Sequence, residues 1–522
     1  MVDKLLQQKI YPYDGEQDST KNPLLISPKD IIGSNNIVYT SYSTKKKRPG
    51  LRHAFDEFRT AGRRVLGSGE YWRLGVQRVV IWDGKFLKAI NPANGIVDNI
   101  TGDHVLPTDE TVTFSKFYGY LIIFFGGGAT QVKAWNGSGT ITNLSVSEPK
   151  AAFGRIWLNK LWLPDTTIRG RLLHSKTSDP TDFVGADAGH VDCDINAGDP
   201  DGMTAIFPPF FGSLYVTKRL STYKITPVRF AADSIAYPAI KISGGTGCIS
   251  HNGVIAVEDN IFFPSDRGIH QFETSDKISE IATALPSRNI QPDWVGGTNF
   301  KRSDYIQAVY DSSLDSLIWL YPSSSHNYPT NAWGFSYVAK KWYMWENYNQ
   351  TSICQYVEVN TKRLRTLVGG SDGNIGIIDE NTKSDYGKKI SCSFQSGIIA
   401  PGGSPNNEFQ YCYISPIFVP QVTGKFVIKI RINGRIVEDL TFNMEDTSLG
   451  DELGDDFILS DSYLGGVPRV KIDTRRINGS GMLYQLLISH EQSSDEEDVG
   501  FELLGILMDV DSDASKTGKG VA

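Results

Sequence analysis

The sequence lacks helical periodicity: no long stretch places apolar residues at the i, i+3, i+4 and i+7 positions of an amphipathic helix. Short runs of β-branched and aromatic residues occur instead, separated by Gly, Asn, Asp and Pro, which is the all-β pattern. Hydrophobic residues make up 40% and aromatic residues 11% of the 522-residue chain. That content excludes a largely disordered chain, and the length is sufficient for two large cores.

Cysteine is also scarce. The chain has five cysteines, Cys193, Cys248, Cys354, Cys392 and Cys412. No two of them form a CxxC pair. An odd, scattered set is typical of buried free thiols in a reducing compartment, and it argues against a disulfide framework.

Long apolar runs and net positive charge are missing as well. The first residues contain no apolar core of a signal peptide, so we expect no cleaved signal. The longest strongly apolar run, Tyr120 to Phe125, is too short to span a bilayer, which predicts no membrane insertion by this chain. The formal net charge of -7 argues against a dedicated nucleic-acid binder, which is normally basic. One local exception is KKKR at 45–48, followed by Pro49 and Gly50.

Short apolar runs recur along the first four fifths of the chain, at starts spaced by roughly 40 to 56 residues, close to the period of a four-stranded propeller blade. The runs are Val79–Ile81, Leu121–Ile123, Leu161–Leu163, Leu214–Val216, Ile261–Phe263, Leu317–Trp319 and a weaker one from Leu364. Several are followed by a tight turn and a second strand, as in IWDGKFLKAI. The pattern predicts a β-propeller over 55–399 with six to eight blades, seven by this count. Each blade of such a fold buries its apolar faces only by stacking on its neighbours.

The flanking segments differ in character. A Gly/Pro/Asn-rich linker at 400–409 is followed by alternating strands, with Asn433-Gly434 as a type I′ hairpin turn. We interpret 400–511 as a β-sandwich domain and 512–522 as a flexible tail. Residues 1–54 hold polar turns and a few apolar anchors, which predicts an extended N-terminal arm rather than a domain.

Few sequence motifs indicate a catalytic or metal-binding site. Ser265–Gly268 and Ser371–Gly373 resemble the Asp-box turns of sialidases but lack the spacing and the Trp, so plain hairpin turns are favoured. Asp192–Asp199 suggests a calcium loop, yet an EF-hand needs Gly at the position of Ala197 and Glu at that of Met203. A strand with one solvent-exposed face, on which Asp192 and Asp194 would lie, is the better interpretation.

Other catalytic patterns fail too. Gly126–Gly128 is not completed by a GKS or GKT, which favours a blade turn over a phosphate loop. The eight histidines form no HxxxH or HExxH, and no GxSxG is present. We therefore nominate no catalytic, cofactor-binding or metal-binding residue, and expect neither an enzyme nor a cofactor.

Two groups of short motifs stand out. The N-terminal segment contains Asn22-Pro23, Asn36-Ile37-Val38 and Arg48-Pro49-Gly50, and a later hairpin contains Ser175, Asp179, Pro180 and Phe183. These motifs resemble those of the tail nozzle or tail hub proteins of short-tailed bacteriophages. In that family an Asn-Pro and a later Asn-x-Val precede an Arg-Pro-Gly, after which the propeller begins, and a later blade has a hairpin ending in Ser-x-x-x-Asp-Pro-x-x-Phe.

The resemblance implies a virion structural protein without enzymatic activity. Such proteins form a homo-oligomeric ring, usually of six copies, below the portal and adaptor rings, and they carry tail fibres or spikes. The ring extends the DNA channel, retains the packaged genome and gates its ejection, so DNA passes without sequence-specific contact. The protein would be located in the virion tail, and in the host cytoplasm during assembly. On this view 45–48 is an exposed turn between arm and first blade.

Two other classes remain open. A propeller glycan hydrolase or depolymerase would place carboxylates at one mouth of the propeller, because glycosidic hydrolysis needs two of them around one bond. A non-catalytic, glycan-binding propeller would be monomeric and would present a ledge of exposed aromatic residues. The absence of Asp boxes and of WD or kelch signatures disfavours both.

Overall fold

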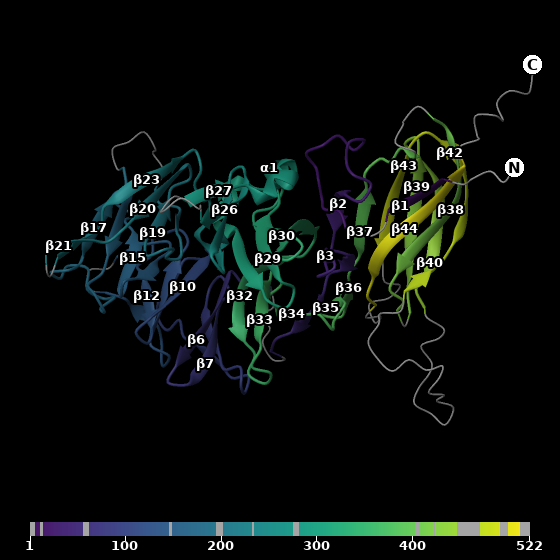
Figure 1. Cartoon of the computed structure of the whole chain (residues 1–522). Helices are drawn as coiled ribbons and strands as arrows, with labels where there is room; N and C mark the ends of the chain where they lie inside the picture. The colour runs from purple at the N-terminus through teal and green to yellow at the C-terminus, as the bar shows by residue number, and fades with distance from the viewer. Residues whose placement is uncertain are drawn as a thin grey trace, which may run out of the picture. The chain divides into compact units, whose positions relative to one another are not determined.

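The computed structural model describes residues 6–10, 14–55, 62–145, 149–194, 202–231, 234–274, 281–401, 407–421, 423–445, 470–490 and 499–511. By packing, the chain divides into two units. The larger unit comprises 53–333 and 347–378, and the smaller unit comprises 1–52, 334–346 and 379–522. Almost all regular structure in the described residues is β-strand (Figure 1).

The larger unit is a succession of small antiparallel sheets in which strands adjacent in sequence pair with one another (Figure 1). Five of these sheets have four strands each. They are β6 (Gly67–Arg73), β7 (Val76–Trp82), β8 (Leu87–Ile90) and β9 (Val97–Asn99); β10 (Val112–Phe117), β11 (Tyr120–Phe125), β12 (Lys133–Trp135) and β13 (Thr142–Asn143); β14 (Arg155–Trp157), β15 (Lys160–Pro164), β16 (Arg171–His174) and β17 (Gly189–Asp192); β18 (Ala205–Ile206), β19 (Leu214–Thr217), β20 (Ser221–Ile225) and β23 (Ala239–Gly244); and β24 (Ile255–Val257), β25 (Asn260–Ser265), β26 (Gly268–Thr274) and β27 (Ile281–Ala284).

Further strands of the larger unit follow the same plan. β28 (Gln307–Asp311) pairs with β29 (Ser316–Pro322), which precedes β30 (Pro329–Ser336). A last sheet begins with β32 (Gln350–Val357), β33 (Leu364–Gly370) and β34 (Ile375–Asp379). The remaining elements are a hairpin and four short helices: β21 (Val228–Ala231), β22 (Ser234–Ala236), η1 (His251–Gly253), η2 (Pro286–Ile290), α1 (Gln291–Gly297) and η3 (Phe300–Tyr305).

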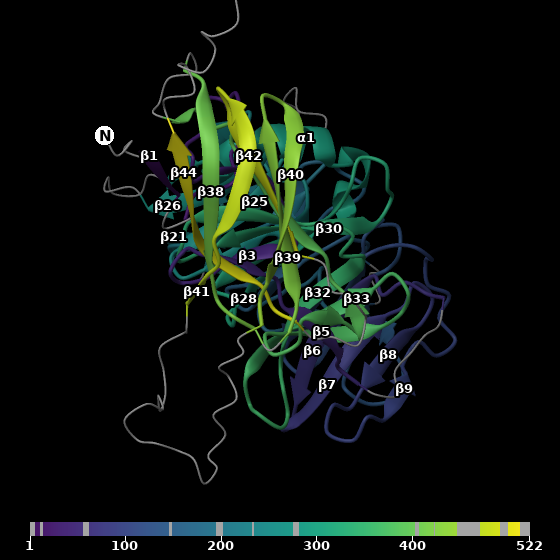
Figure 2. The same cartoon turned by 90° about the vertical axis from the view of Figure 1, so that its right-hand side faces the viewer.

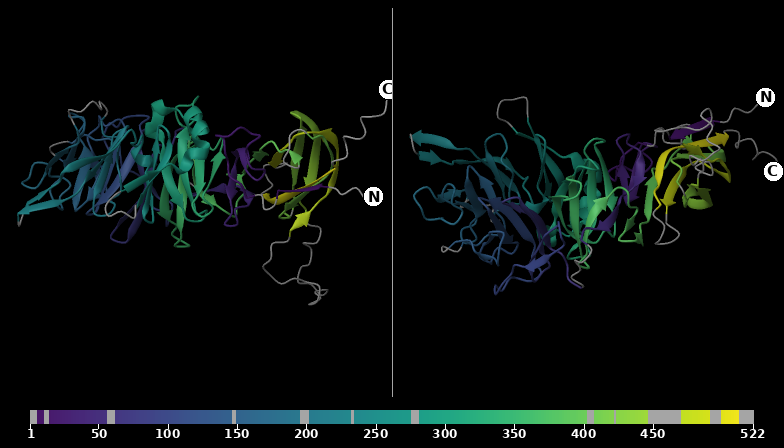
Figure 3. Two further views of the ribbon diagram at one scale, coloured as in Figure 1. Left: turned by 45° about the horizontal axis from the view of Figure 1, so that its top comes forward. Right: turned by 90° about the horizontal axis from the view of Figure 1, so that it is seen from below.

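Each apolar run found in the sequence lies in the second strand of one of these sheets. Four or more consecutive residues of β11, β15, β19 and β29 are buried, because both faces of these strands are covered. Two-sided burial explains why the sequence shows continuous apolar runs there, with no alternation. Two further views show that strands make up this unit throughout, in colours from blue to teal (Figure 3).

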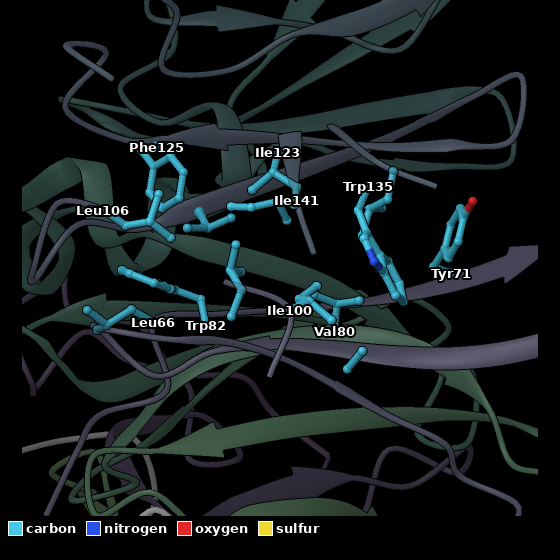
Figure 4. Packing of buried hydrophobic residues seen from close by; sticks show 14 of the residues in the cluster. Leu66, Tyr71, Val80, Trp82, Ile100, Leu106, Ile123, Phe125, Trp135 and Ile141 are labelled. Atoms are coloured by element: carbon cyan, nitrogen blue, oxygen red, sulfur yellow. The ribbon is translucent and has the colours of Figure 1, made fainter. Parts of the chain in front are cut away.

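The core consists of layers between successive sheets. Val80 and Trp82 of β7 pack against Ile123 and Phe125 of β11, and the Trp82 and Phe125 rings meet edge to face with centroids 5.3 Å apart (Figure 4). The opposite face of β7 joins a second cluster. There Val79 and Ile81 pack with Leu367, Ile375 and Ile377 of β33 and β34.

The smaller unit contains two facing sheets. The first has the order β3-β4-β44-β38-β41, with β1 beside β44 and β42 beside β38, and the second has the order β2-β37-β43-β39-β40 (Figure 2). Phe418 of the first sheet packs against Phe426 of the second, with ring centroids 5.0 Å apart, so this part is a sandwich. The strands are β1 (Leu6–Ile10), β2 (Ile31–Asn35), β3 (Ile37–Tyr39), β4 (Lys45–Lys47), β37 (Cys392–Ser396), β38 (Phe409–Phe418), β39 (Lys425–Ile432), β40 (Arg435–Asn443), β41 (Lys471–Ile472), β42 (Arg475–Gly481), β43 (Tyr484–His490) and β44 (Glu502–Asp511). β5 (Gly50–His53), β31 (Lys341–Trp345), β35 (Ser384–Asp385) and β36 (Lys388–Lys389) complete the set.

The Asn433-Gly434 turn joins β39 to β40 with φ of 48° and 84°, the positive values that a type I′ turn requires. Strands from residues 6–52 are built into both sheets: β1 and β4 pair with β44, and β2 pairs with β37. The segment expected to be an arm thus finds its strand partners more than 300 residues away in the same chain. The boundaries at 54/55 and 399/400 stay sequence predictions. The tail expected at 512–522 lies outside the described residues.

Candidate functional site

Three of the four basic residues at 45–48 are buried, and Lys46 is partly exposed. The side chains of Lys45, Lys47 and Arg48 are at most 2% exposed. The expectation of an exposed turn is therefore wrong. β4 is an interior strand with β3 on one side and β44 on the other, so its flanks are covered. Lysine is seldom fully buried, which is why the sequence pattern suggested a surface turn.

The buried lysines direct their ammonium groups to carbonyl oxygens and aromatic rings. Lys47 Nζ donates to the Val499 carbonyl at 3.0 Å, and Lys45 Nζ lies 3.5 Å from the Lys29 carbonyl. Lys45 Nζ also lies 5.6 Å from the centroid of the Tyr39 ring. Burial lowers the pKa of Lys45 well below its ordinary value, and the positive charge of Lys341 lowers it further.

Arg48 joins three segments of the smaller unit. Its Nη atoms form a bidentate pair with the Asp385 carboxylate, with Nη1 to Oδ1 at 2.9 Å. Nε donates to Asn36 Oδ1 at 3.0 Å, and the guanidinium carbon lies 5.7 Å from the Trp345 ring centroid. Nη1 also donates to the Pro49 carbonyl at 3.0 Å. Arg48 is thus a structural anchor.

Gly50 permits a close approach of two backbones. A Cβ on this residue would lie 2.0 Å from the Ser384 carbonyl oxygen, and the Gly50 N–H donates to the Thr382 carbonyl at 2.6 Å. We expect Gly50→Ala to lower the free energy of unfolding of the smaller unit by about 3 kcal/mol, because a backbone oxygen cannot rotate away. Urea unfolding measures this loss. Gly33→Ala in β2 is the control, since a Cβ there meets nothing within 4 Å, and an equal loss in both variants would contradict this explanation.

The turns weighed as Asp boxes lie in hairpins. Ser265 pairs with Gly268 at the β25–β26 turn, where Ser265 Oγ donates to the Gly268 carbonyl at 2.9 Å. The Asp266 carboxylate forms a bidentate pair with Arg219, at 2.7 and 2.8 Å. Ser371–Gly373 connects β33 to β34. The arrangement of these residues is that of structural turns.

The suggested calcium loop is only partly described. Asp192 ends β17 and pairs with Arg171, with Oδ1 2.7 Å from Nε, and Asp194 follows with φ of 47°. Residues 195–199 of that loop lie outside the described residues. Gly126–Gly128 follows β11, and the Gly127 N–H donates to Glu110 Oε2 at 2.9 Å. In the described part of the chain, no three His, Cys, Asp or Glu side chains are grouped as metal ligands would be.

A cavity of about 980 Å³ lies in the larger unit. Its wall is formed by the first strands of the successive sheets, β6, β10, β14, β24, β28 and β32, and by Pro208 after β18. The charged residues in this wall are Glu70, Lys116, Arg155 and Glu258. A second cavity of about 430 Å³ shares Thr113, His251 and Asn252 with the first. We call the first the central cavity.

Glu70 is held in place on one side of the central cavity. Its Oε1 accepts hydrogen bonds from Gln77 Nε2 at 2.7 Å and from the Val357 N–H at 2.8 Å. Lys116 Nζ lies 4.0 Å from its Oε2. The orientation of this carboxylate is therefore fixed by its neighbours.

A second polar group lies on β14 and η1. The Ile206 N–H donates to His251 Nδ1 at 3.2 Å, and the Ile206 carbonyl accepts from Arg155 Nε at 2.9 Å. The His251 ring stacks on Phe153 with centroids 4.5 Å apart. Burial lowers the pKa of Arg155 to about 10, and burial followed by the Arg155 charge lowers the pKa of His251 well below its usual value. His251 is therefore neutral near pH 7, with its proton on Nε2 because Nδ1 accepts.

No sequence motif singles out Arg155 or His251. Each lies next to apolar residues in the sequence: Arg155 in GRIWL and His251 in ISHNGV. A basic side chain in such a setting is the one sequence feature that distinguishes them. Neither their spacing nor the local sequence pattern indicates that both side chains hydrogen-bond to the backbone of Ile206.

No known family and no curated protein matches the sequence. Among solved structures, a chain of the "Crystal Structure of Mitotic Checkpoint Complex" is similar with a TM-score of 0.37 and 10% identity, over 63% of this chain and 91% of that one. PorZ, a surface component of the type-IX secretion system of Porphyromonas gingivalis, is similar with a TM-score of 0.37 and 11% identity, over 67% of this chain. The match spans 43% of the PorZ chain, and neither similarity bears on function. Among the described helices, none has the length and apolar character needed to cross a bilayer.

Proposed function

We propose that the sheets of the larger unit close into a seven-bladed propeller. Two observations support this. The face of β7 that does not pack on β11 packs on β33 and β34, so the first sheet in the chain contacts the last. The first strands of the sheets also surround one cavity, as the inner strands of propeller blades do.

The protein itself is a structural component of a short phage tail, the ring-shaped nozzle or hub. Copies of the chain assemble into a ring, usually hexameric in the family that the sequence resembles. The ring lies below portal and adaptor, binds tail fibres or spikes, and encloses the DNA channel. The chain performs no catalysis. Its net charge of -7 suits a channel that must release DNA, because a basic wall would retain the phosphate backbone.

The observation that supports this proposal is the position of the residues behind the resemblance. The Arg48 N–H donates to the Asn36 carbonyl at 2.9 Å, and Arg48 Nε bonds the Asn36 side chain. The Pro23 carbonyl accepts from the Ile398 N–H at 2.9 Å. Gly50 fits against Ser384, where no side chain would. The Asn-Pro and Arg-Pro-Gly motifs therefore have a common physical role, because each attaches the N-terminal segment to residues between 384 and 398 of the smaller unit. Asn36 of the Asn-x-Val motif supports this role by binding Arg48.

Light scattering and electron microscopy of the purified full-length chain test the proposal. We expect rings of several copies with a central hole, at least at high protein concentration or after addition of the portal and adaptor proteins. A chain that stays monomeric under both conditions would contradict the nozzle function. Turnover of a host-surface polysaccharide by the purified chain would instead establish the propeller glycan hydrolase.

A further inference from the structure

The Arg155 guanidinium has unused hydrogen-bonding capacity. It presents five N–H donors, of which Nε–H is used by the Ile206 carbonyl. Arg155 forms no ion pair with any carboxylate of the described residues. Its side chain is partly buried, which lowers its pKa, and a partly buried guanidinium without a counter-charge is unfavourable.

Two more donors lie beside it on η1. His251 accepts at Nδ1, which leaves the Nε2–H as a donor in the wall shared by the two cavities. Asn252 Oδ1 accepts from Thr113 Oγ1 at 2.9 Å, which assigns its Nδ2 amide as a donor. The ring of His251 is fixed by the Phe153 stack and by Ile206, so this group of donors is preorganised.

The carboxylates of the central cavity do not neutralise this group. Glu70 is engaged by Gln77, the Val357 N–H and Lys116. Glu258 lies in the same wall, just past the end of β24. The volume of about 980 Å³ is that of a small-molecule site.

We propose that the central cavity binds a small oxyanion, a phosphate or a carboxylate group, on Arg155, His251 and Asn252. The planar guanidinium matches the two oxygens of either group, and charge-assisted hydrogen bonds are the strong ones. The imidazole N–H and the amide supply neutral donors to the remaining oxygens. This site is separate from ring assembly, so it is independent of the proposed function.

Calorimetric titration of the full-length chain with inorganic phosphate and, separately, with citrate tests the site. We expect at least one anion to bind at about millimolar concentration or below and to raise the melting temperature. Binding of phosphate alone assigns a phosphate ligand, and binding of citrate alone assigns a carboxylate. Absence of binding by both at about 10 mM would overturn the proposal.

Variants locate the binding. Arg155→Gln should weaken it by at least about tenfold, because the only cation of the donor group is lost. Arg171→Gln, in the same sheet but ion-paired with Asp192, is the matched control and should bind as the wild type does. Asn252→Asp keeps the acceptor for Thr113 and places a negative oxygen toward the anion, so it should also weaken binding if Arg155→Gln does not fold. Equal affinity in Asn252→Asp and the wild type would overturn the site.

Discussion

Asp385→Ala should lower the free energy of unfolding of the smaller unit by about 3 kcal/mol, because it leaves the buried Arg48 guanidinium without its carboxylate. Arg48 is 2% exposed and Asp385 is 23% exposed, so little water can replace the lost oxygens. Asn36 Oδ1 and the Pro49 carbonyl, which also accept from Arg48, carry no full charge. Urea unfolding followed by tryptophan fluorescence, to which Trp345 beside Arg48 contributes, measures the change.

A matched variant separates burial from ion pairing as such. Asp439 pairs with Lys429 at 3.4 Å in the same unit, but the two side chains are 54% and 42% exposed. Asp439→Ala should therefore cost less than about 1 kcal/mol. The double variant Arg48→Met with Asp385→Leu should regain part of the loss, since no uncompensated charge stays buried. An equal loss from Asp385→Ala and Asp439→Ala would contradict the anchoring role of Arg48.

Local patterns predicted much of the larger unit. The apolar runs at Val79–Ile81 and Leu121–Ile123 became the second strands of their sheets, because two-sided burial leaves a continuous apolar signal in the sequence. The Asn433-Gly434 turn was equally visible, because its positive φ values select few residue types. The all-β class follows from features of this kind, each contained within about ten residues.

Non-local pairings were not predictable in the same way. Arg48 meets Asp385 across 337 positions, and β2 pairs with β37 through contacts such as Asn35 to Ser393. Nothing in the run KKKR distinguishes a buried interior strand from an exposed turn. The stretch is interior because β3 and β44 pair with the two edges of β4, and the run itself does not reveal those pairings. The donor group of the central cavity could not be predicted from the sequence for the same reason. Arg155 and His251 are distant in the sequence and are joined by hydrogen bonds to the backbone of Ile206.

Lowering the pH from 6.5 to 5 should destabilise the protein by several kcal/mol, through histidines buried in the neutral form. Burial lowers the pKa of His174 and His270 to about 4 and that of His490 to about 3, and it lowers the pKa of His251 well below its usual value. The unfolded chain takes up these protons near pH 6.5, whereas the folded chain does not. Stability is therefore complete above pH 6.5 and declines as the pH falls toward the folded pKa, by about 2 kcal/mol per histidine at pH 5.

Charged neighbours set the limits of this effect. Arg267 faces His270, Lys47 faces His490 and Arg155 faces His251, and each cation opposes protonation of the ring. Buried carboxyls act in the opposite direction, because burial raises the pKa of Asp304 and Glu346 and so favours the folded state as the pH falls. The sum of the histidine contributions is therefore an upper limit. Urea midpoints at pH 7, 6 and 5 give the net slope.

His490→Leu isolates one contribution. Neither ring nitrogen of His490 has a hydrogen-bond partner among the described residues, and the ring stacks on Phe501 with centroids 5.6 Å apart. Leucine removes the titration together with two unsatisfied polar atoms, so stability at pH 7 should be unchanged or higher and the acid loss of the smaller unit should shrink by about 2 kcal/mol at pH 5. His326→Leu, which replaces an exposed histidine in the larger unit, is the control for the loss of an imidazole. A wild-type slope in His490→Leu would mean that other groups cause the acid sensitivity of this unit.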